Sequence, residues 1–167
     1  SARRALSRGE IKDALLSYES QAREAEATAT KSSSPEAHWK TAAAAYSQAA
    51  RAARISGQLQ KAIAYGQKAL EAAEKLKNPE LWLSANEQLL LAYRSLNNFD
   101  KSRELLEKGL VVVKEIPADT YTRVAWEANL YDKIGQDLMR RRDYEKAIDA
   151  FSQCIYLSED RLTRAYS

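Results

Sequence analysis

The sequence predicts an all-α fold built from paired helices, and three observations support this class. The composition is helical, because alanine, leucine and charged residues are abundant while only 5 glycines and 3 prolines occur in 167 residues. Two sets of breaks alternate along the chain, so that each long helical stretch ends in a short turn or at a proline. A broad apolar stripe with helical spacing recurs in every second helix, and no segment shows the alternation of a strand.

The breaks define the helices. Each proline precedes a new helical pattern, where proline ends one helix or opens the next. Ser34 and Asn78 are predicted to cap the helices that follow them, and Asp119 or Thr120 takes that role in the third case. The second set of breaks consists of short turns at 56–58, 96–98 and 140–143. Together the breaks predict helices at 10–29, 35–55, 58–77, 79–96, 99–115, 119–141 and 143–157.

The helices that follow the short turns superpose on a small anchor residue. The anchors are Ala14, Ala62, Ser102 and Ala147, which are 48, 40 and 45 residues apart. Four residues after each anchor come Tyr18, Gly66, Leu106 and Phe151. The small positions allow another helix to approach closely. Because one helix pair cannot bury both of its apolar faces, neighbouring pairs must cover one another.

The last of these segments carries a family motif. It reads Ile134-Gly135-x2-Leu138, then Tyr144, Ala147-x3-Phe151 and Cys154. This pattern resembles the tetratricopeptide repeat, whose signature is a Leu-Gly-x2-Tyr element followed by Ala-x3-Phe. The resemblance covers residues 35–157 well and residues 1–34 loosely.

The resemblance implies a right-handed solenoid of helical hairpins with long helices, forming one domain. It divides the chain into a partial first repeat with a linker at 1–34, repeats at 35–78, 79–117 and 118–158, and the start of a further helix at 159–167. Residues 1–7 are expected to be the tail of an earlier helix. Such partial ends imply that this sequence is a piece of a longer protein. Self-association through exposed repeat ends stays open as an alternative.

The sequence offers little that could perform catalysis. His38 is the only histidine and lies in the first turn of a predicted helix, while Cys154 lies on the apolar stripe as a packing residue. Carboxylates occur in helix-surface pairs such as Glu104 with Lys108. Phosphate-loop and metal-ligand spacings are absent from the sequence. We therefore predict a protein that is not an enzyme and that uses no cofactor or metal.

Charge and hydropathy indicate neither a nucleic-acid nor a membrane partner. The 26 basic and 23 acidic residues are interspersed, with a net charge of +3. No apolar run approaches the roughly 18 residues of a membrane span. The arginines at 140–142 are interpreted as a solvated helix end, where cations gain about 0.3–1 kcal/mol, with a partner contact by Arg140 as the alternative. The compartment stays open, with the cytoplasm slightly favoured.

In tetratricopeptide arrays the first helix of each pair lines a concave face. Carried over by position, the family pattern implies these partner-binding residues: Arg51, Arg54, Glu87, Leu91, Arg94, Asn129, Asp132, Gln136 and Arg140. The arginines either face a carboxylate-bearing peptide or only keep the surface soluble. An RNA-binding repeat would need stacking aromatic residues there, and these positions contain none.

The function that the resemblance implies is a protein-interaction scaffold, which binds a peptide or helix of a partner protein in the concave groove. The alternative is a regulatory or structural segment attached to a catalytic domain outside this sequence. The identity of the partner is left open by both.

Overall fold

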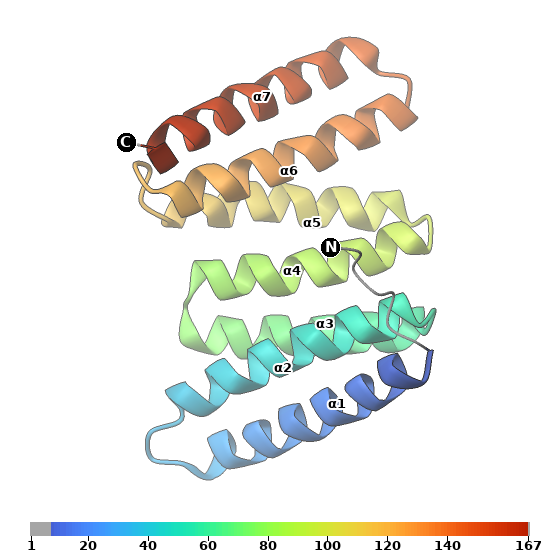
Figure 1. Ribbon diagram of the computed structural model, residues 1–167, viewed down its shortest axis with the longest axis vertical. Coiled ribbons are helices and arrows are strands. Elements are labelled where there is room, and N and C mark those ends of the chain that lie inside the picture. Colours follow the sequence, from blue (N-terminus) through green and yellow to red (C-terminus); the bar gives the residue numbers. More distant parts are fainter. Residues whose placement is uncertain (1–7, 167) are drawn as a thin grey trace. The chain divides into compact units, whose positions relative to one another are not determined.

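The computed structural model describes the backbone of residues 8–166 (Figure 1). Its helices are α1 (Arg8–Lys31), α2 (Glu36–Ile55), α3 (Leu59–Leu76), α4 (Pro79–Ser95), α5 (Phe99–Val112), the short 3-10 helix η1 (Val113–Glu115), α6 (Tyr121–Arg140) and α7 (Tyr144–Tyr166). No strand occurs among the described residues, so the predicted all-α class is confirmed. The predicted helix tail at 1–7 lies outside the described residues.

Two of the predicted helix caps are confirmed and one is wrong. The side chains of Asn78 and Thr120 accept hydrogen bonds from backbone amides three residues later, at 3.1 and 3.3 Å. Ser34, by contrast, does not cap α2. Pro35 occupies the cap position with backbone angles that are already helical, and its carbonyl accepts the first intrahelical bond, from Trp39 at 2.9 Å. The helix therefore starts one residue later than predicted.

The further helix predicted to start at 159 is also wrong, because α7 continues without a break from Tyr144 to Tyr166. The segment after 157 contains neither glycine nor proline, so nothing local stops the helix there. The prediction relied on repeat length rather than on such a signal.

The three predicted short turns are confirmed and share one backbone geometry. Two residues after each helix comes a residue with positive φ: Gly57 (79°), Asn97 (57°) and Arg142 (62°). The next amide then donates to the carbonyl five residues earlier, at 2.8, 2.9 and 3.0 Å respectively. This is the Schellman arrangement of a helix C-terminus. Its threefold recurrence at corresponding positions supports the repeat found in the sequence.

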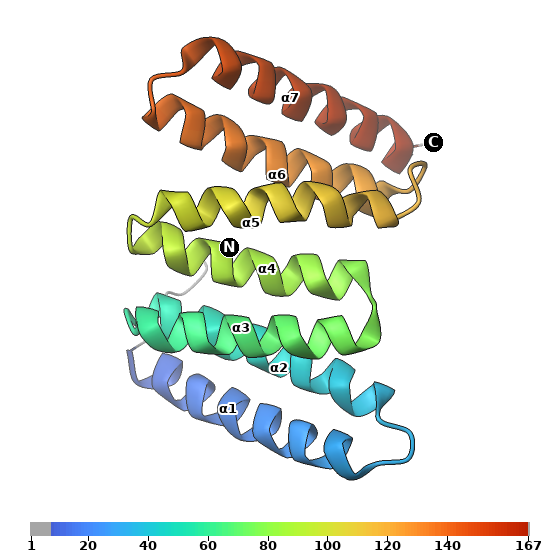
Figure 2. The same ribbon diagram turned by 180° about the vertical axis from the view of Figure 1, so that it is seen from behind.

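The chain forms two compact units, residues 1–98 with α1–α4 and residues 99–167 with α5–α7. In unit 1 each helix packs on the next one along the chain, and α2 also contacts α4; α2 and α3 cross in both views (Figures 1 and 2). In unit 2, α6 contacts α5 and α7. This neighbour-on-neighbour packing is that of a helical repeat solenoid, as predicted. The division into repeats stays a prediction, and the border between the units falls inside the predicted repeat 79–117.

Small residues fill the core of unit 1 and allow close helix packing. Alanines on the inner sides of α2 and α3 are buried, and the anchor Ala62 is 0% exposed. A Cβ at Gly66 would lie only 3.1 Å from the Cβ of Leu89, so α3 and α4 meet where a side chain is missing. The largest side chain in this core is Tyr46, which is 1% exposed.

In unit 2, small residues likewise allow close packing of helices. Its anchors Ser102 and Ala147 are 0% exposed. The ring of Phe151 lies where the Cβ of residue 135 would be, which explains the glycine at that position. Cys154, predicted to be buried, is only half-buried, because the outer side of α7 is open to solvent in unit 2.

Candidate functional site

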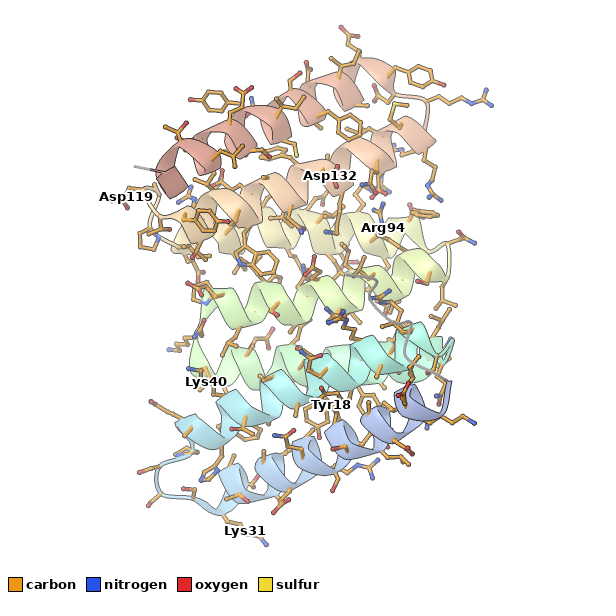
Figure 3. All side chains as sticks on the ribbon, in the orientation of Figure 1. Tyr18, Lys31, Lys40, Arg94, Asp119 and Asp132 are labelled. Atoms are coloured by element: carbon orange, nitrogen blue, oxygen red, sulfur yellow. The ribbon has the colours of Figure 1, made fainter. Side chains whose placement is uncertain are left out.

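The partner-binding residues implied by the family pattern fall into two sets, one in each unit. The set on unit 1 consists of Arg51 and Arg54 on α2 with Glu87, Leu91 and Arg94 on α4. Their spacings of three, four and seven residues place the members on one face of each helix. Since α2 contacts α4, unit 1 brings these two rows onto neighbouring helices; Arg94 can be located on α4 in Figure 3. We call this set the α2–α4 face.

Arg54 is the most constrained member of the α2–α4 face. Its side chain is half-buried, and its Nε is buried without a hydrogen-bond partner among the described residues. Burial lowers the pKa of the Arg54 guanidinium, the neighbouring cation of Arg51 lowers it further, and the carboxylate of Glu87 raises it. A buried donor that lacks an acceptor costs about 1–3 kcal/mol. The guanidinium is therefore placed where an added acceptor would be favourable.

The α2–α4 face carries more positive than negative charge. Three arginines stand against the single carboxylate of Glu87. Leu91 adds a half-buried apolar side chain to this face. In addition, Gln88 on α4 has a buried Oε1 that no described group reaches. Guanidinium groups in such a setting bind carboxylates through paired, charge-assisted hydrogen bonds.

The set on unit 2 lies along α6 and is occupied by contacts within that unit. Gln136 donates to Asp132 at 2.9 Å, and Lys133 donates to Asn129. These side chains thus satisfy one another along the helix. The structure shows no unsatisfied buried donor on this face of α6 within the described residues, in contrast to Arg54.

The arginines at 140–142 lie at the end of α6. Arg140 is the last residue of α6, and its guanidinium carbon lies 3.4 Å from the centre of the Phe99 ring, which is a cation–π contact within unit 2. Arg141 caps the helix and Arg142 is the residue with positive φ. The side chain of Arg140 thus packs on a neighbouring helix, while Arg141 and Arg142 form the end of α6 through their backbone.

Sequence reasoning missed two hydrogen bonds in unit 1, one buried and one partly buried. Tyr46 donates to Glu26 and Tyr65 donates to Glu19, and both glutamates belong to α1. Burial raises the pKa of both tyrosines, and the bonds to the carboxylates raise it further. The predicted surface pair Glu104–Lys108 is confirmed at 3.0 Å. Glu19 and Glu26 differ from it, because they accept hydrogen bonds from tyrosines of other helices. In the sequence, these bonds were indicated by the spacing of seven residues between Glu19 and Glu26, which places both on one side of α1.

Other site types find no support in the described part of the chain. No cluster of three or more histidine, cysteine, aspartate or glutamate side chains is arranged there to hold a metal ion. None of the helices among those residues combines the length and apolar character that a bilayer crossing requires.

Comparison with known families supports the resemblance in one segment. Residues 128–161, from α6 into α7, match the tetratricopeptide repeat family. This hairpin contains Gly135 packed against Phe151, the contact described above. A search of curated proteins finds no match to the chain. The number of repeats stays a prediction. Tetratricopeptide repeats use their surfaces to hold other proteins, so the matched segment indicates a protein-interaction module.

Proposed function

We propose that the chain binds an acidic, extended segment of a partner protein on the α2–α4 face of unit 1. The observation that carries this proposal is the buried, unbonded Nε of Arg54 beside the like charge of Arg51. A carboxylate of the ligand pairs with the exposed guanidinium of Arg51 and with the accessible part of the Arg54 side chain, and it offsets the repulsion between the two cations. Leu91 provides an apolar contact for the ligand's backbone or for a neighbouring side chain.

The lowered pKa of Arg54 supports an anionic ligand independently of the family pattern. A half-buried arginine with a lowered pKa is less favourable in the free protein than in a complex that supplies an anion. The free energy recovered on binding is of the order of one charge-assisted hydrogen bond, about 1.5–3 kcal/mol. Binding is therefore expected to weaken as salt concentration rises, because exposed charges such as Arg51 are screened.

The test uses a labelled peptide library rich in aspartate and glutamate, matched by a library with asparagine and glutamine at the same positions. Fluorescence polarisation measures binding to the wild type, to Arg54→Glu/Arg94→Glu and to Lys31→Glu/Lys61→Glu. The last variant makes the same change in net charge at exposed positions of α1 and α3.

The wild type is expected to prefer the acidic library, the arginine variant to lose affinity by about tenfold or more, and the lysine variant to keep it. Circular dichroism checks that helicity is unchanged. Equal binding of the acidic and neutral libraries, or equal losses in the two charge-reversal variants, would refute the site.

A further inference from the structure

The groove between α1 and α2 is open, whereas the equivalent groove between α3 and α4 is filled by α2. The anchor alignment relates α1 to α3, and α2 packs on both α3 and α4. Ala62 and Ala69 of α3 are 0% exposed beneath that packing. The equivalent residues of α1, Ala14 and Gln21, are half-buried and exposed. Unit 1 thus shows within itself which element fits such a groove, namely a helix.

The open groove is apolar along its floor and basic at its sides. Two adjoining hollows of about 190 and 410 Å³ share Tyr18 and Gln48 and together follow the length of α2. Figure 3 labels Tyr18 on α1 and Lys40 near the beginning of α2. Lys40 and Arg51 line the hollows, and no acidic side chain among the described residues does. From Lys40 to residue 55 the groove follows about 22 Å of helix.

The outer side of α7 in unit 2 carries a matching apolar stripe. Its members are Tyr144, Ile148, Ile155 and Leu162, which are 54, 64, 60 and 52% exposed. Their spacing along a helix with 3.6 residues per turn places them in one line, and from Ile148 to Leu162 the line is about 21 Å long. Isolated exposed apolar residues are ordinary, but a continuous stripe marks an interaction surface.

Acidic residues flank this stripe on its solvent side. Helical periodicity places Glu145 and Glu159 on the side of the stripe that faces solvent, and both are exposed. The stripe and the groove therefore match in length and in apolar character, and their charges are opposite in sign.

We propose that α7 of one molecule docks into the α1–α2 groove of a second copy, so that the chain associates head to tail. The sequence left self-association open, and this proposal assigns it to two specific surfaces. The two surfaces differ, so the interface is heterologous, and association continues beyond the dimer unless the geometry closes a ring. The groove shares Arg51 with the α2–α4 face, but the test below changes only residues of α1 and α7, so the failure of one proposal can be distinguished from the failure of the other.

Sedimentation velocity over two decades of protein concentration provides the first test. The average mass of the wild type is expected to rise above the 18.8 kDa of one chain. Ile155→Asp and Ala14→Glu are each expected to weaken association by about tenfold or more. Their controls are Tyr156→Asp, at a 69% exposed site off the stripe, and Ala27→Glu, at an exposed site elsewhere on α1; both should associate like the wild type.

Mixing the two disrupted variants tests the head-to-tail arrangement itself. Ile155→Asp keeps an intact groove and Ala14→Glu keeps an intact α7, so the mixture should form a one-to-one pair that neither variant forms alone. Circular dichroism establishes that each variant keeps its helicity. A wild type that stays at the mass of one chain at all concentrations overturns the proposal. A dimer of Ala14→Glu alone also overturns it, since that result shows association without an intact groove.

Discussion

Tyr46 on α2 donates a hydrogen bond to the carboxylate of Glu26 on α1, and the same relationship recurs between Tyr65 on α3 and Glu19. The two tyrosine rings stack on each other with their centres 6.0 Å apart. Lys68 lies 3.5 Å from Glu26 and adds a cation above the Tyr46 ring. One pair of residues in α1, two helical turns apart, thus holds this helix to the two that follow it.

Removing the phenol hydroxyl of Tyr46 should destabilise unit 1. Tyr46→Phe keeps the buried ring but leaves the half-buried Glu26 carboxylate with Lys68 at 3.5 Å in place of the tyrosine donor, and the expected loss is about 1–2 kcal/mol. Urea unfolding followed by circular dichroism measures it. Tyr156→Phe is the matched control, because Tyr156 is 69% exposed and should show no change. A loss no greater than that of the control would mean that the bond contributes nothing net.

The same tyrosines should make stability fall at alkaline pH. The ordinary pKa of tyrosine is 10.0, and burial followed by the glutamate hydrogen bonds raises the pKa of Tyr46 and Tyr65 in the folded state. Above pH 10 the unfolded chain loses protons that the folded chain retains, so the free energy of unfolding decreases as pH rises. Below pH 10 this contribution is fully present.

The measurement compares the wild type with Tyr46→Phe/Tyr65→Phe by urea unfolding from pH 8 to 11, with pH 10 as the onset fixed by the ordinary tyrosine pKa. The comparison subtracts the titration of lysines, which both proteins share. The slope of stability against pH above 10 should be steeper in the wild type. Parallel curves would show that neither hydroxyl titrates differently on folding.

Arg142 occupies a backbone conformation that suits glycine. Its φ is 62°, and the equivalent turn after α2 has Gly57 with a φ of 79°. The left-handed conformation costs a residue with a Cβ roughly 1–2 kcal/mol, partly offset because glycine gains more freedom in the unfolded chain. Arg142→Gly should therefore raise the free energy of unfolding of unit 2 by about 0.5–1 kcal/mol. Gly57→Ala should lower that of unit 1, and urea unfolding checks both signs.

Gly135 should not tolerate a methyl group while Phe151 is present. A Cβ at position 135 would lie 2.6 Å from the Phe151 ring, so Gly135→Ala forces the ring or the helices apart. The expected loss is about 1–3 kcal/mol. In a Phe151→Ala background the same substitution should cost almost nothing. A double-mutant cycle by thermal unfolding decides this, and additive losses would exclude the clash as the cause.

Arg54 should lower stability in the free protein. Its Nε is buried without an acceptor, so Arg54→Met is expected to raise the free energy of unfolding by about 1 kcal/mol while it weakens binding of acidic peptides. Arg51→Met, at an exposed position on the same helix, should change stability by less than about 0.5 kcal/mol. Chemical unfolding provides both values. A clear loss on replacing Arg54 would show that the guanidinium is already satisfied.

Local signals explain why most helix bounds could be predicted. Asn78 and Thr120 cap helices within three residues of themselves, and the short turns end helices through backbone bonds that span five residues. Where the prediction relied on repeat length, as at 159, it was wrong because α7 meets no stop signal. For the candidate site, the family pattern predicted which positions on the helix faces are involved, but not what their side chains contact.

The sequence by itself determined the all-α class, the order of helices and turns, and the small anchors that let helices approach each other. Only the tertiary structure decided which side chains are paired: Glu26 with Tyr46, Arg140 with Phe99, and Arg54 left with a buried donor. The physical reason is one of range. A cap or a turn depends on neighbouring residues, whereas the partner of a helical side chain depends on the offset and crossing of helices, which the packing of distant residues sets.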